Sequence, residues 1–166
     1  GLGDVYKRQL YAERNFLFRI STAEVELEES DFTSLPDYNR LIASVSGTMR
    51  LAHGANGSEK LVLPRSTVYA FDGGIQTHCV GKARDLNLML RKGAAEGELV
   101  FVDSGTELDL EPAANETMLL FELESGNAAL CAGGNARLRC TANGQCALFT
   151  VRLVGEAIPD SDNRNG

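Results

Sequence analysis

Short runs of alternating hydrophobic and polar residues, separated about every 8 to 12 positions by turn-forming residues, follow one another along most of this chain. Alternation with a period of two is typical of β-strands, because successive side chains point to opposite faces of a sheet. No stretch has the period of a long helix. The best helical candidate, residues 26–35, is acidic and reads as a loop or single turn that Pro36 ends. The pattern predicts an all-β sandwich or barrel.

The clearest alternation lies in residues 85–91, which read Asp-Leu-Asn-Leu-Met-Leu-Arg. It sends the leucines to one face, which we expect in the core, and Asp85, Asn87, Met89 and Arg91 to the other. If that second face is also buried, its polar groups need hydrogen-bond partners or a ligand, and the segment lines a binding pocket. The alternative is that these residues cap a barrel end or lie on a solvated face.

A second strand-like run covers residues 18–25, where Arg19 and Ser21 share a face with Ala23. An arginine beside small and apolar residues can bind a carboxylate through two parallel hydrogen bonds. The alternative is a structural ion pair between Arg19 and Asp85. The two roles are compatible, because a carboxylate can hold a ligand-binding arginine in place.

Two segments share a pattern at an offset of 79 residues: LIASVSGTMRL starting at Leu41, and LFELESGNAAL starting at Leu120. A turn rich in Gly and Asn and another strand-like run follow each of them. The repeat predicts two related halves. We expect residues 91–97 to link these halves.

The four cysteines, Cys79, Cys131, Cys140 and Cys146, lack the spacing of a metal or redox motif. A two-residue hairpin turn is expected at Asn143-Gly144, and it would place Cys140 and Cys146 on opposite faces. We therefore expect four thiols in a reducing compartment, buried mostly as small hydrophobic side chains.

Two stretches of the chain are similar to the HutD/Ves family of bacterial proteins. They are FRISTAEV from Phe18, continued by Phe32, Leu35-Pro36 and Tyr38-Asn39-Arg40, and FDGGIQTHCVGKARDLNLMLRKG from Phe71. The match extends over residues 16 to 154. The resemblance implies a cupin-like double β-barrel. It also implies a link to histidine utilisation, with a pathway metabolite such as a formylated glutamate as the ligand.

The ends of the chain do not follow the strand pattern. Residues 4–9 can be back-translated into a sequence that resembles a transposon adapter, so residues 1–9 read as a sequencing artefact and the chain as truncated at its N-terminus. The family carries a Trp-x-Asn-Gly-Gly-like motif upstream, near the pocket, and this chain has no tryptophan. We expect a first cupin-like barrel over residues 10–93, a second over 94–156, and a disordered tail over 157–166.

Charge and hydropathy limit the classes of partner that the protein can bind. The net charge is −7 and the basic residues are dispersed, which argues against binding to nucleic acid. No apolar run approaches the roughly 20 residues that span a bilayer, so we expect no membrane partner and a cytoplasmic location. A homodimer is left open.

The two histidines offer little for metal or nucleophilic chemistry. They form no His-x-His pair, so we expect no metal and no cofactor. His53 precedes a Gly-Ala-Asn-Gly turn and is expected to be exposed to solvent. His78 and Cys79 are adjacent in a strand-like run and point to opposite faces, which disfavours a Cys–His nucleophile pair.

The leading hypothesis is a metal-free protein that binds a small carboxylate metabolite through Arg19, Ser21, Asp85, Asn87 and Met89. A regulatory role in histidine utilisation is implied by the family resemblance alone. The second hypothesis is an enzyme that acts on such a metabolite, with Asp85 as general acid or base. The third is a structural β module that binds no ligand.

Overall fold

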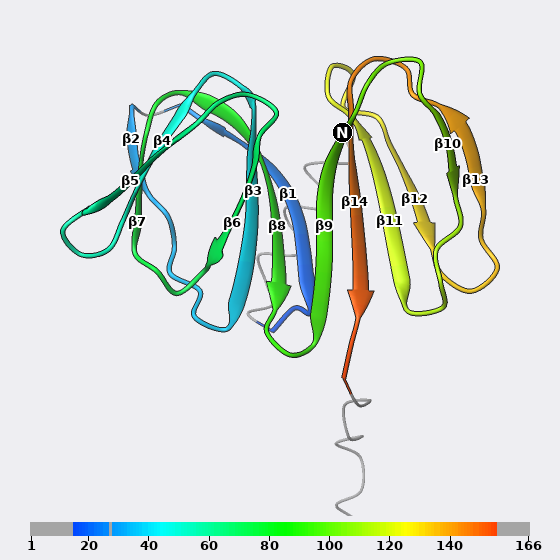
Figure 1. Cartoon of the computed structure of the whole chain (residues 1–166), viewed down its shortest axis with the longest axis horizontal. Coiled ribbons are helices and arrows are strands. Elements are labelled where there is room, and N and C mark those ends of the chain that lie inside the picture. Colours follow the sequence, from blue (N-terminus) through cyan, green and yellow to red (C-terminus); the bar gives the residue numbers. More distant parts are fainter. Residues whose placement is uncertain (1–14, 27, 156–166) are drawn as a thin grey trace, which may run out of the picture.

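The computed structural model describes residues 15–26 and 28–155, and this part of the chain consists of β-strands and the turns between them (Figure 1). The predicted artefact over residues 1–9 and the predicted tail lie outside the described residues. The strands are β1 (Phe18–Val25), β2 (Glu29–Asp31), β3 (Tyr38–Ser46), β4 (Met49–His53), β5 (Glu59–Leu63), β6 (Val68–Asp72), β7 (Thr77–Val80), β8 (Ala83–Arg91), β9 (Ala95–Val102), β10 (Glu107–Leu110), β11 (Glu116–Glu122), β12 (Ala128–Ala132), β13 (Leu138–Thr141) and β14 (Cys146–Leu153).

The strands form four antiparallel sheets, which lie side by side as layers (Figure 1). Sheet A has the order β1-β8-β3-β6, and sheet B the order β2-β7-β4-β5. Together they enclose the first barrel. Sheet C has the order β12-β11-β14-β9, and with the two-stranded sheet D, β10-β13, it encloses the second barrel. The predicted all-β, cupin-like double barrel is confirmed.

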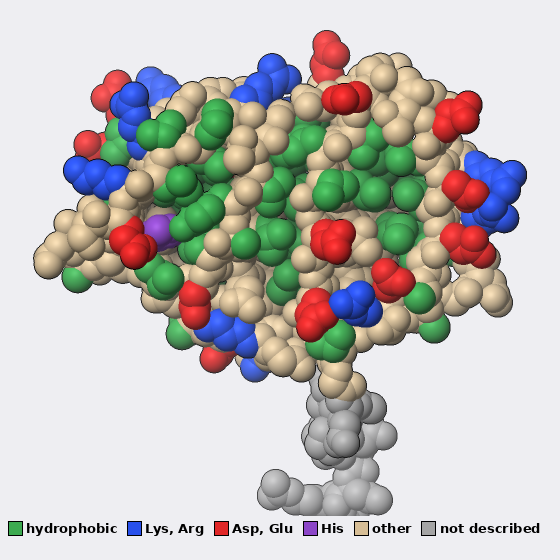
Figure 2. Space-filling model, viewed as in Figure 1, with side chains coloured by type: hydrophobic (Ala, Val, Ile, Leu, Met, Phe, Trp, Pro, Cys, Tyr) green, Lys and Arg blue, Asp and Glu red, His purple; other side chains and the backbone are tan. Residues whose placement is uncertain are grey.

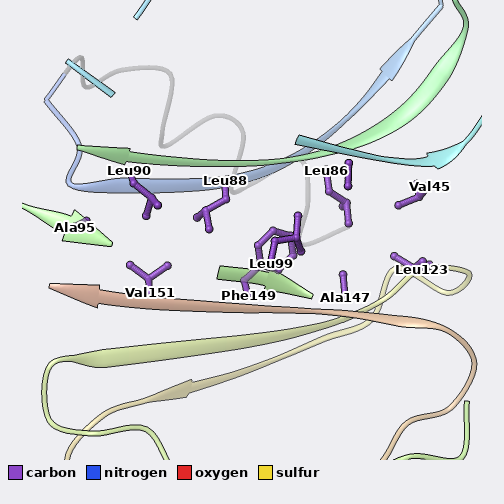
Figure 3. Packing of buried hydrophobic residues seen from close by; sticks show 11 residues of the cluster. Val45, Leu86, Leu88, Leu90, Ala95, Leu99, Leu123, Ala147, Phe149 and Val151 are labelled. Atoms are coloured by element: carbon purple, nitrogen blue, oxygen red, sulfur yellow. The ribbon is translucent and has the colours of Figure 1, made fainter. Parts of the chain in front are cut away.

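A layer of apolar side chains joins sheet A to sheet C and forms the largest core of the molecule (Figure 3). Leu86, Leu88 and Leu90 point from β8 towards Phe149 and Val151 of β14. The leucine face of β8 is therefore core, as predicted. The other face of sheet A looks into the first barrel and is also buried, so β8 is covered on both sides.

Each barrel also has a core of its own. The first contains the buried residues Ile42, Met49, Leu51, Leu63, Phe71, Cys79 and Ala83. The second contains Val102, Leu110, Leu120, Ala142 and Cys146, with further apolar side chains packed around them. Within the described chain, sheet D has no counterpart of the β4–β5 hairpin, so the second barrel is the smaller one.

Two glycines that make the same hydrogen bond in each half show which residues of the two halves are equivalent. The Gly73 amide after β6 donates to Tyr38 O at 2.8 Å, and the Gly133 amide after β12 donates to Glu116 O at 2.8 Å. Since Tyr38 begins β3 and Glu116 begins β11, these two strands are equivalent at an offset of 78 residues.

The offset of 79 predicted from the sequence is therefore wrong by one position within these strands. It pairs Leu41, which packs between sheets A and C, with Leu120, which lies inside the second barrel. A slip of one residue in a strand exchanges its two faces.

Two further local predictions are wrong. The hairpin at Asn143-Gly144 does not form, because β13 pairs with β10 while β14 pairs with β11 and β9. Residues 26–35, expected as a loop or single turn, contain the short strand β2, which pairs with β7. Cys79, Cys131 and Cys146 are buried, and Cys140 is half-buried.

Gly73→Ala should lower the free energy of unfolding by about 2–3 kcal/mol, because an added methyl group overpacks a fixed corner. A Cβ atom there would lie 2.7 Å from both Leu35 O and Tyr38 O, which are backbone atoms that cannot rotate away. Urea unfolding of Gly73→Ala beside Gly93→Ala checks this. Gly93 has a positive φ but open space around it, so its substitution should cost only about 1 kcal/mol. Equal losses would contradict the prediction.

Candidate functional site

The five residues predicted to bind ligand lie together on the inner face of sheet A. Across the β1–β8 pair, Arg19 is opposite Met89, Ser21 is opposite Asn87, and Ala23 is opposite Asp85. Directly opposed residues of an antiparallel pair share a face. Arg19 and Asp85 lie on neighbouring strands of the same sheet, four positions apart in register.

Arg40, which sequence reasoning did not select, lies at the centre of this face. It is opposite Met89 in the β3–β8 pair and only 5 % exposed. Its Nη2 donates to Asn87 Oδ1 at 2.8 Å, and its guanidinium carbon lies 4.9 Å from the Phe32 ring centre and 5.4 Å from that of Phe71. The signal was available, because alternation in residues 38–46 places Arg40 opposite to the apolar face of β3.

Burial lowers the pKa of Arg40 to about 10, and the positive charge of Arg19 adds to this while the negative charge of Asp85 opposes it. The guanidinium is still protonated at neutral pH. The first barrel therefore holds a desolvated cation, which gains from any further negative charge brought close to it.

A buried hydrogen-bond donor at this point lacks an acceptor. Arg40 Nε is buried and makes no hydrogen bond within the described chain. Asn87, which is 5 % exposed, accepts from Arg40 through its Oδ1 and leaves Nε without a partner. Buried donors in native proteins nearly always have partners. The local need is thus for a group that only accepts hydrogen bonds.

Asp85 provides the negative charge on this face. It is 3 % exposed, and its Oδ1 accepts from the Ala23 amide at 3.1 Å. Burial first, and the Asp85 charge second, raise the pKa of the Cys79 thiol to about 11. Cys79 is therefore protonated at neutral pH, and this neighbour gives Asp85 no partner for acid–base chemistry.

His53 was predicted to be exposed to solvent, and this is wrong: it is buried inside the first barrel. Its Nδ1 lies 2.8 Å from Thr77 Oγ1, and its Nε2 lies 2.8 Å from the Tyr69 hydroxyl oxygen. The alternation of Met49, Leu51 and His53 in β4 predicts this burial, because Met49 and Leu51 are core residues. The prediction of exposure relied on the Gly-Ala-Asn-Gly turn after His53, and a turn does not determine which way the residue before it points.

His78, by contrast, lies on the outer face of sheet B, where its Nδ1 is 2.8 Å from Asp31 Oδ1. In the part of the chain that the structure covers, no group of three or more His, Cys, Asp or Glu side chains is placed to hold a metal ion. The same part contains no helix of sufficient length and apolarity to cross a membrane.

The second barrel shows that the fold itself does not require these polar residues. Met118 of β11 takes the place of Arg40, and the strand β14 opposite it carries Leu148 where β8 carries Asn87. By the same register Cys146 takes the place of Asp85. The core cluster of the second barrel is apolar. Arginine, aspartate and asparagine at these three positions are thus specific to the first barrel.

A shallow depression of about 390 Å³ lies at the end of β1, beside Glu24, Glu26 and Arg84, and Arg40 and Asn87 are not among the residues that line it. On one broad face, hydrophobic side chains gather over the middle and most charged side chains lie around the rim (Figure 2). The interior of the first barrel remains the stronger candidate.

Comparison with known proteins gives three findings. The family model HutD matches residues 7–152. The structure of HutD from Pseudomonas fluorescens SBW25, in a formate condition, is 24% identical with a TM-score of 0.68, over 85% of this chain and 82% of that chain. A conserved protein of unknown function from Pseudomonas aeruginosa PAO1 is 28% identical with a TM-score of 0.66, over 84% of this chain and 83% of that chain. No curated protein matches this chain.

Proposed function

Because this chain belongs to the HutD family, we propose that it is a binding protein that holds a small carboxylate metabolite inside its first barrel. The observation that carries the proposal is the buried donor Arg40 Nε, for which the described chain supplies no acceptor. A carboxylate is an acceptor-only group at neutral pH, and arginine is the side chain best suited to bind it.

The other residues on this face support the same role. Arg19 adds a second positive charge near Arg40. The negative charge of Asp85 offsets part of the desolvation free energy of these two guanidinium groups. Ser21 lies beside Asn87 and adds a hydroxyl, and Met89 forms an adaptable apolar wall next to Arg40. Phe32 and Phe71 pack against the guanidinium, with ring centres 4.9 and 5.4 Å from its carbon, and form the apolar part of its surroundings.

The biological role that we propose is regulatory and lies in histidine utilisation, in the cytoplasm. A formylated glutamate is the first metabolite to test, since family membership supports it. The ligand would be bound without a metal or cofactor.

Formylglutamate, glutamate and urocanate should be screened by thermal shift. A ligand at 100 times its Kd should add about 2.7 kcal/mol, which raises Tm by roughly 5–10 °C in a protein of this size. Arg40→Met should abolish the shift, because it removes the cation and its hydrogen-bond donors. Arg50→Met, an exposed position on the outer face of sheet B, is the matched control and should keep the full shift.

Arg19→Met should weaken the ligand response without removing it. Circular dichroism establishes that each variant is folded. The carboxylate proposal fails if none of the three acids shifts the parent protein, or if Arg40→Met responds as the parent does.

A further inference from the structure

A directed chain of hydrogen bonds includes His53 and Tyr69, whose rings, like the Arg40 guanidinium, contact Phe71. Thr77 Oγ1 donates to Ile75 O at 3.1 Å. A threonine hydroxyl has one proton, so in its bond to His53 Nδ1, at 2.8 Å, Thr77 must be the acceptor. The His53 imidazole therefore carries its proton on Nδ1.

This assignment fixes the role of the tyrosine. In the neutral imidazole, Nε2 is then an acceptor, so the bond of 2.8 Å to the Tyr69 hydroxyl is donated by Tyr69. The Tyr69 oxygen has used its only proton and keeps the capacity to accept a hydrogen bond. Tyr69 lies on β6 at an edge of sheet A, and its bond to His53 of β4 connects sheet A to sheet B.

Phe71 contacts both polar groups. Its ring centre is 5.4 Å from the Arg40 guanidinium carbon, 5.1 Å from the His53 ring centre and 5.5 Å from the Tyr69 ring centre. The first barrel thus has donors at Arg40 and Asn87, an acceptor at Tyr69 further along β6, and the apolar Phe71 ring in contact with both Arg40 and Tyr69.

From this arrangement we infer that the ligand is a carboxylate with an N–H or O–H donor at its opposite end, and that Tyr69 determines this specificity. The inference rests on the proposed carboxylate site, since Arg40 fixes one end of the ligand. A donor near Tyr69 would complete its hydrogen bonding, whereas a ligand with a methyl group there would displace water from the half-buried oxygen without replacing its hydrogen bond.

Succinamate and levulinate test this directly, because they differ only in an amide NH₂ against a methyl group next to the same carbonyl. Titration calorimetry at about pH 8 should find succinamate binding about ten-fold more tightly to the parent protein. In Tyr69→Phe the two affinities should become equal, mainly through weaker binding of succinamate.

Arg40→Met should bind neither acid, which separates the two ends of the site. Equal affinities of the two acids for the parent protein would overturn the inference and leave the carboxylate site standing. So would a preference for succinamate that survives in Tyr69→Phe. If the parent protein binds neither these acids nor formylglutamate, glutamate or urocanate, the carboxylate site fails as well.

Discussion

Phe149→Ala should lower the free energy of unfolding by about 3–5 kcal/mol, because it removes a large side chain from a core that cannot collapse around the gap. Phe149 is 1 % exposed and lies in the apolar layer between sheets A and C, against leucines of β8 (Figure 3). The layer is lined by two sheets whose strands are hydrogen bonded on both sides at this point. The cavity would therefore persist.

Urea unfolding followed by circular dichroism measures this loss, which corresponds to a fall in Tm of roughly 6–20 °C. Leu130→Ala is the control, since Leu130 is a hydrophobic residue of sheet C that is 59% exposed and its truncation should cost no more than about 0.5 kcal/mol. Both barrels should unfold in a single transition in the parent protein, because they share this layer. A loss below about 1 kcal/mol for Phe149→Ala would show that the layer contributes little.

The second large effect concerns the polar interior of the first barrel. Asp85→Cys alone should cost about 3–5 kcal/mol, because it leaves Arg40 buried without the opposing charge. The triple variant Arg40→Met, Asp85→Cys, Asn87→Leu copies the side chains that the second barrel has at the equivalent positions. It should regain that loss. Its free energy of unfolding should lie within about 1 kcal/mol of that of the parent protein, or exceed it by up to about 4 kcal/mol.

Urea unfolding of the parent protein, the single variant and the triple variant gives the comparison. The triple variant should also show no thermal shift with any of the carboxylates. If it is less stable than Asp85→Cys, the buried polar residues are required by the fold. If it remains responsive to the ligand, they are not the binding site.

Alternation along the chain was enough to predict the strands and the all-β class, because a period of two is a local property of the sequence. It also predicted the leucine face of β8 correctly. It could not tell that both faces are buried, since this depends on sheet C packing against sheet A. The hairpin at Asn143-Gly144 failed for the same reason: a good turn sequence does not say which strand its neighbours pair with.

The candidate site was predicted in part. Asp85, Asn87 and Arg19 were selected because they interrupt apolar patterns, and they share one face of sheet A. Arg40 and His53 were missed although each follows the alternation of its own strand. Arg40 was not singled out at all, and His53 was assigned to the surface because a turn follows it. Alternation shows on which side of its strand each of these residues lies. Their hydrogen-bond partners depend on the pairing of strands that are distant in the sequence.

The two buried faces of β8 also decide how this strand can pair. Sliding β8 by one residue against β1 and β3 would turn Asp85 and Asn87 into the apolar layer between the barrels and point the leucines at Arg40. The misaligned state would bury a carboxylate and an amide without partners, and it would strand an arginine among aliphatic side chains. The polar residues of the first barrel thus penalise the nearest competing alignment during folding. In the triple variant both faces of β8 are apolar, and this protection against misalignment is lost.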